Sequence, residues 1–254
     1  MIRELATFFA ALRFFTRLPV PAWVGHSPQQ LEQAARYFPL VGIVVGAIGA
    51  LVTVAAAQWL PASLAILAGM TATVLVTGAF HEDGFADAVD GFGGGRDKAR
   101  VLDIMKDSRI GSFGAVAVAL MLLAKFNALA QIDALGGWRT LAPALIAGHA
   151  ISRLAATTLM RALHYVREDD SAKSRPLTRP LAAAELAVAA LCGLSPCLLL
   201  PGAKVWVAIG LAAAVTVLAA GYFVRRIGGY TGDCLGAAQQ VAELAFYVGL
   251  CASS

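Results

Sequence analysis

The stretch 81–91, HEDGFADAVDG, carries four carboxylates directly after a long apolar run. If it is helical, Asp83, Asp87 and Asp90 share one face, because residues spaced i, i+4 and i+7 lie above one another. Three like charges on one face repel each other, so the arrangement predicts a bound cation. Carboxylate oxygens are hard ligands that suit Mg²⁺ or Mn²⁺. The stretch therefore predicts a metal site, with Glu82 as a further ligand or as a catalytic base.

A further acidic residue, Asp233, stands in the glycine-rich segment 228–236, GGYTGDCLG, just before an apolar stretch. In one interpretation Asp233 or Thr231 caps the helix that follows. In the other, Asp233 completes the metal site or acts as a base from a second element, and the glycines let backbone approach a substrate closely. The residues alone leave both roles open.

Basic residues near these acids predict phosphate binding, since Lys and Arg make charge-assisted hydrogen bonds to phosphate. The segment 105–114, MKDSRIGSFG, precedes an apolar stretch with Ser112 as the expected N-cap, and anions bind readily at such helix ends. The alternative is that these charges only anchor the loops at a membrane surface. The phosphate-binding candidates are Lys106, Arg109, Arg153, Lys173 and Arg175.

The elements that must position these residues are apolar helices. Of 254 residues, 59% are hydrophobic and 14% charged, and the mean hydropathy is +0.71. This excess is too large for one soluble core and is laid out in blocks near bilayer length. We expect an all-α, polytopic integral membrane bundle of about seven transmembrane helices, forming a single domain. The expected spans are 39–60, 64–81, 113–131, 140–160, 182–200, 204–224 and 235–251.

The charged segments predict how the chain sits in the bilayer. Segment 1–38 opens with alternating aromatic and basic residues, the pattern of an amphipathic helix lying on the membrane surface. Lys and Arg then gather in alternate connections, near 82–112, 161–181 and 225–234. The positive-inside rule places the N-terminus and these loops in the cytoplasm. This placement accounts for the net charge of +4 without nucleic acid as a partner.

Three phrases in these loops resemble the cobalamin synthase family: FHEDGFADAVDGFGGG (80–95), MKDSRIGSFG (105–114) and GGYTGDCLGA (228–237). Segments 8–21 and 36–46 are also typical of that family. The resemblance implies a Mg²⁺-dependent transferase of the bacterial inner membrane, acting late in vitamin B12 biosynthesis. It would join adenosylcobinamide-GDP to α-ribazole or its 5′-phosphate and release GMP. A second copy of the chain or other enzymes of corrinoid assembly are its expected protein partners.

Two other functions fit the same residues. CDP-alcohol phosphotransferases also bind metal on an Asp-rich helix, but their DGxxAR opening is absent here, where Asp83-Gly84-Phe85-Ala86-Asp87 stands instead. A cation transporter could use the same carboxylates. It would be expected to place ionisable groups along a path near the bilayer midplane, whereas the candidate chemistry here gathers on one side.

Overall fold

The computed structural model describes residues 2–25, 28–167 and 181–252. Within these ranges the chain is helical, and its β structure is limited to one isolated bridge between Tyr165 and Tyr230, so the predicted all-α class is confirmed. The helices are α1 (Ile2–Phe15), α2 (Pro28–Ala34), η1 (Ala35–Tyr37), α3 (Phe38–Ala56), α4 (Ala62–Thr77), α5 (Phe80–Gly94), α6 (Lys98–Lys106), α7 (Ser112–Gly136), α8 (Trp138–Ala162), α9 (Ala183–Leu194), η3 (Ser195–Leu199), α10 (Lys204–Ile227) and α11 (Gly232–Leu250).

Three helical stretches in the described part are long and apolar enough to cross a membrane: Gln30–Ala56, which contains α3, together with α7 and α10. A fourth would require α4 and α5 to count as one span, although they meet at 84°. Every predicted apolar block does contain a helix, but seven crossings are not confirmed. Helix α4 has 16 residues and α9 has 12, which at 1.5 Å per residue fall short of a bilayer core.

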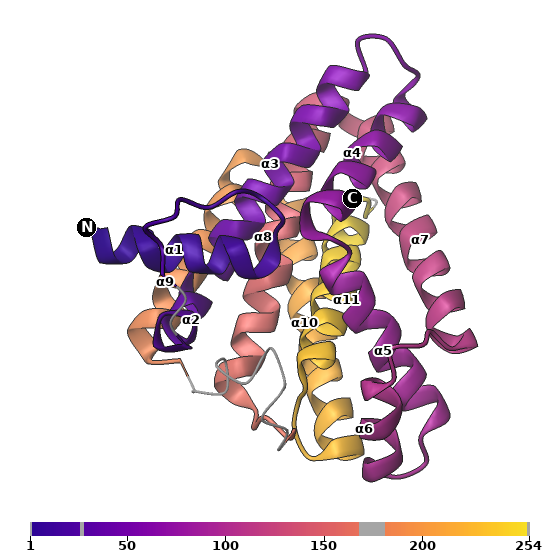
Figure 1. Cartoon of the computed structure of the whole chain (residues 1–254). Helices are drawn as coiled ribbons and strands as arrows, with labels where there is room; N and C mark the ends of the chain where they lie inside the picture. The colour runs from indigo at the N-terminus through magenta and orange to yellow at the C-terminus, as the bar shows by residue number, and fades with distance from the viewer. Residues whose placement is uncertain (1, 26–27, 168–180, 253–254) are drawn as a thin grey trace.

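Helices α8 and α11 form the centre of the bundle (Figure 1). Helix α8 packs against α3, α9 and α11, and α11 packs against α5, α8 and α10. The outer helices expose large apolar side chains instead, such as Leu120 and Leu123 on α7 and Val217 and Leu218 on α10. Because soluble proteins rarely expose apolar surface so continuously, the distribution agrees with a membrane protein.

Helix α1 lies across the long helices (Figure 1) and is held by polar contacts as well as apolar ones. Glu4 forms an ion pair with Arg36 at 2.7 Å and accepts a hydrogen bond from the Tyr37 hydroxyl, also at 2.7 Å. At its other end the ring of Phe15 packs edge-on against Phe38, with centroids 4.5 Å apart. Helix α1 is thus fixed to the start of α3.

The turn between α4 and α5 sets the direction of the acidic helix. Gly78 and Ala79 both adopt left-handed backbone, with φ of 66° and 58°, a conformation that ends helices. The Ala79 N–H donates to the carbonyl of Val74 at 2.9 Å and satisfies one of the last carbonyls of α4. The chain leaves this turn at 84° to α4, so the carboxylates of α5 lie beyond the apolar helix that precedes them.

Candidate active site

Helices α5 and α11 cross in direct backbone contact, and this crossing builds the site. A Cβ atom on Gly84 would lie 3.2 Å from the Cα of Asp233, and one on Gly236 would lie 3.2 Å from the Cα of Gly84. A larger residue at either glycine would push the helices apart. The bare backbone at Gly84 therefore faces α11.

The crossing brings Asp233 to the acidic face of α5. Asp83 is exposed and Asp87 half-buried, and the charge of Asp87 interacts unfavourably with those of Asp83 and Asp233. Thr231 caps α11, its hydroxyl oxygen accepting from the Cys234 N–H at 3.2 Å, so the Asp233 side chain is not needed as a cap. Two of the three predicted metal ligands and the acid from the second element thus gather in one place.

Arg167 is the cation at this cluster, and sequence reasoning did not select it. Its guanidinium donates to Asp233 Oδ2 at 2.7 Å and to the Met105 carbonyl at 3.1 Å, while its buried Nε has no hydrogen-bond partner. Burial raises the pKa of the Asp233 carboxyl, Arg167 opposes this rise, and the Asp83 charge adds to it. A short backbone pairing, Val166 N–H to the Tyr230 carbonyl at 3.0 Å, places Arg167 beside the start of α11.

Asp90 has a partner that the helical pattern could not indicate. Its two carboxylate oxygens accept from the Gly111 N–H at 2.7 Å and the Gly114 N–H at 2.9 Å, at the start of α7. The N-cap is Gly111, so the expectation of Ser112 was wrong. A carboxylate of the chain itself therefore occupies the helix end that we expected to bind phosphate.

Replacing Asp90 with Ala is expected to destabilise the protein by roughly 1–3 kcal/mol, because two N–H groups in the first turn of α7 lose their acceptor. Thermal unfolding of the detergent-solubilised protein without added metal measures this loss. Asp97→Ala is the matched control, since Asp97 caps the short α6 through one bond to the Arg100 N–H. An unchanged melting temperature for Asp90→Ala would contradict the capping role.

The predicted phosphate-binding residues are dispersed. Lys106 ends α6, next to the carbonyl that Arg167 contacts. Arg109 is exposed and paired with Asp107 at 2.7 Å, and its hydrogen bonds lower the pKa of Asp107 to about 2. Arg153 is buried in α8. The remaining two, Lys173 and Arg175, lie outside the described residues.

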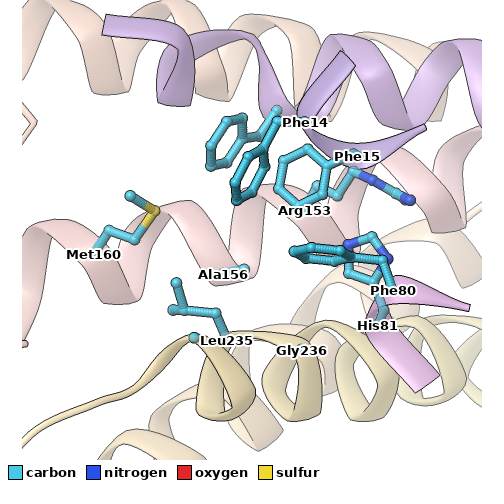
Figure 2. Close-up of a pocket in the computed structure, with 11 residues that line it drawn as sticks. Phe14, Phe15, Phe80, His81, Arg153, Ala156, Met160, Leu235 and Gly236 are labelled. Carbon is cyan, nitrogen blue, oxygen red and sulfur yellow. The ribbon is translucent and has the colours of Figure 1, made fainter. Parts of the chain in front are cut away.

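Arg153 lines an aromatic pocket between α1, α3, α5, α8 and α11. Figure 2 shows the rings of Phe14, Phe15, Phe80 and His81 beside it. The Arg153 Nη1 donates to the carbonyl of His149 one turn earlier, at 2.9 Å, and its buried Nε has no partner. The guanidinium of Arg153 therefore lies inside the bundle among aromatic rings, where Nη1 also lies 3.3 Å from His149 Nδ1 and the charges of Glu243 and Glu82 act on it.

Glu82 points to a different neighbour from the other α5 acids. Its Oε1 accepts from Gln240 Nε2 of α11 at 3.1 Å, and its Oε2 is buried without a hydrogen-bond partner. The two predicted catalytic residues thus differ in their surroundings, because Asp233 is paired with a guanidinium and Glu82 is held by a neutral amide.

The cluster matches Mg²⁺ in its donors but does not form a complete cage. Asp83, Asp87 and Asp233 offer only carboxylate oxygens, the donors this cation prefers. Among the described residues, no three His, Cys, Asp or Glu side chains converge closely enough to hold a metal ion by themselves. Mg²⁺ is commonly held by one or two carboxylates together with water and substrate phosphates, so the residues suit a cation that binds with its substrate.

The fold defines a helical membrane protein, and its site brings the acidic helix α5 against Asp233 and Arg167. The chain matches the family described as Cobalamin-5-phosphate synthase over residues 7–251. It is 47% identical to the adenosylcobinamide-GDP ribazoletransferase of Shewanella frigidimarina, over 97% of this chain and 94% of the relative. It is 44% identical to the protein of that name from Leptothrix cholodnii, over 98% and 96%.

The chain therefore belongs to the cobalamin-5-phosphate synthase family, and it is a transferase of cobalamin biosynthesis. The resemblance seen in its three loop phrases is confirmed. No solved structure matches the chain significantly.

Proposed function

We propose that the chain joins adenosylcobinamide-GDP to α-ribazole, or to its 5′-phosphate, and releases GMP with the help of Mg²⁺. The names of the relatives support the two substrates. The observation that carries the chemistry is the meeting of Asp83, Asp87 and Asp233 beside Arg167. Phosphoryl transfer depends mainly on positioning and on neutralising charge, which such a cluster supplies once a cation is bound.

In this proposal Asp83 and Asp87 would hold Mg²⁺, and Arg167 would contact the diphosphate. The bound cation would neutralise charge on the phosphate oxygens. A ribose hydroxyl of the acceptor attacks the phosphorus nearest the corrinoid, a P–O bond forms, and the bond to the GMP oxygen breaks. The hydroxyl proton passes to Glu82, whose Oε2 has no hydrogen-bond partner, whereas Asp233 is paired with Arg167.

We also propose how many helices cross the membrane and on which side the charged loops lie. Each predicted apolar segment contains a helix, and α1 lies across the bundle as a surface helix would (Figure 1). The distribution of Lys and Arg supports about seven crossings, with α1 on the membrane surface and the charged loops in the cytoplasm of a bacterial inner membrane. Both substrates would then reach the site from one side.

The purified protein is expected to release GMP when given adenosylcobinamide-GDP, α-ribazole and Mg²⁺. EDTA should abolish this release and added Mg²⁺ or Mn²⁺ should restore it. Chromatography of the nucleotide product provides the measurement. CMP formed from a CDP-lipid would indicate the lipid phosphotransferase instead, and ion flux into sealed vesicles without a nucleotide product would indicate a transporter.

A further inference from the structure

A buried ion pair joins two helices inside the bundle, away from the acidic cluster. Lys125 of α7 lies 3.1 Å from Glu243 Oε1 of α11, and both side chains are at most 6% exposed. The Tyr247 hydroxyl donates to the same oxygen at 3.2 Å, and His149 Nδ1 lies 3.6 Å from the other oxygen. Glu243 is therefore held as a fixed acceptor in the interior.

This fixed acceptor decides the orientation of the next side chain, Gln239. The Gln239 Nε2 donates to Glu243 Oε2 at 2.7 Å and to the Ser152 hydroxyl oxygen at 2.8 Å. An ionised carboxylate can only accept hydrogen bonds, so the amide nitrogen of Gln239 must face Glu243. Its amide oxygen then faces the opposite way.

Gln239 in turn orients Gln240. The Gln240 Nε2 donates to Gln239 Oε1 at 2.9 Å and to Glu82 Oε1 at 3.1 Å. Because the Gln239 oxygen and the Glu82 carboxylate both accept, only the amide nitrogen of Gln240 fits between them. The chain of contacts thus runs from Lys125 to one oxygen of Glu82 and leaves the other oxygen without a partner.

We infer that Gln240 is a positioning residue for the reaction, and that the buried pair Lys125–Glu243 fixes its orientation through Gln239. This inference rests on the proposed function, in which Glu82 accepts the proton of the attacking hydroxyl. A carboxylate held through one oxygen keeps its other oxygen in a defined direction for proton transfer. No ligand contact is assigned to Gln240 itself.

The position of this network favours such a role over a purely stabilising one. A buried ion pair that serves stability alone can often be replaced at little cost when both partners are exchanged together for apolar side chains of similar volume. Here the two amide side chains of α11 connect the ion pair to Glu82 of α5 by successive hydrogen bonds. Glu82 directly precedes the predicted metal ligand Asp83. The network therefore connects the membrane-embedded helices to the candidate site.

A double-mutant cycle tests the inference. Gln240→Met keeps the side-chain volume close and removes the donor, and it should lower kcat about 10- to 100-fold while both KM values change less than about twofold. Adding Gln240→Met to Glu82→Gln should lower kcat no further, because Gln240 acts through Glu82. The measurement is GMP release by full-length protein in detergent. Gln58→Met, at an exposed amide after α3, is the matched control.

Gln239→Met provides a second variant if Gln240→Met folds poorly, since it leaves Gln240 in place and removes the acceptor that orients it, together with the donor to Glu243 and Ser152. We expect a smaller loss of kcat, again absent in the Glu82→Gln background. Additive losses, or a rise in KM without a fall in kcat, would overturn the positioning role while leaving the proposed function intact. A wild-type protein that releases no GMP would reject the proposed function and, with it, the inference.

Discussion

Asp83→Asn and Asp87→Asn are each expected to lower GMP release at least about 100-fold, and together about 1,000-fold or more, without loss of folded protein. Each change removes a negative charge from the cluster that would hold the cation. Because these carboxylates repel each other and Asp233, the variants should be as stable as the wild type or slightly more stable. GMP release at a Mg²⁺ concentration that saturates the wild type measures the effect on turnover.

The control for this prediction is Asp103→Asn, an exposed acid on the neighbouring helix α6 that we assign no role. Its turnover should remain within about twofold of the wild type, since exposed charges contribute little. Raising the Mg²⁺ concentration should recover part of the activity of each single variant, because one carboxylate remains. Near-normal activity in both Asp83→Asn and Asp87→Asn would reject the metal site.

The acidic site was predictable from the sequence where local spacing decides the geometry. Asp83 and Asp87 are one helical turn apart, so any helix through them places them on one face. Asp233 directly precedes an apolar stretch, so the sequence placed it at the N-terminal end of the helix that this stretch forms. Its meeting with α5 depends on the Gly84–Gly236 crossing, for which the sequence showed only the glycines.

The partners of individual side chains depend on docking between helices and could not be predicted. Asp90 lies on the same face of α5 as Asp83, yet it meets two N–H groups of α7 because of how those helices pack. Arg167 is one of several basic residues in its loop, and only the backbone pairing with Tyr230 selects it. Composition could not reveal either contact.

The apolar blocks predicted the helices better than they predicted the crossings. Helices α8 and α11 lie at the centre of the bundle and carry buried polar residues, including Arg153, Gln239 and Glu243. Such groups lower hydropathy, yet Gln239 and Glu243 pair with Ser152 and Lys125 of other helices, as polar groups inside a bundle commonly do. A sequence window measures composition and cannot detect these pairings.

Glu243→Leu is expected to destabilise the protein by about 3–5 kcal/mol, the largest loss of stability that we predict for one substitution. The carboxylate of Glu243 accepts from Tyr247 and Gln239 and faces the charge of Lys125. Its removal leaves the Lys125 ammonium group buried without its counter-ion. It also deprives the Tyr247 hydroxyl and the Gln239 amide of a hydrogen-bond acceptor. Thermal or denaturant unfolding in detergent measures the change.

Lys125→Met should cost less than Glu243→Leu, because the remaining Glu243 keeps its hydrogen bonds from Tyr247 and Gln239. The double variant Lys125→Met with Glu243→Leu should recover part of the loss, since neither charge is then buried without its partner. Strict additivity of the two changes in unfolding free energy would show that the pair is not coupled.

The double variant should still lose turnover, because Gln239 would no longer have the acceptor that orients it toward Gln240. Recovered stability with lost turnover would separate the contribution of this network to folding from its contribution to the position of Glu82.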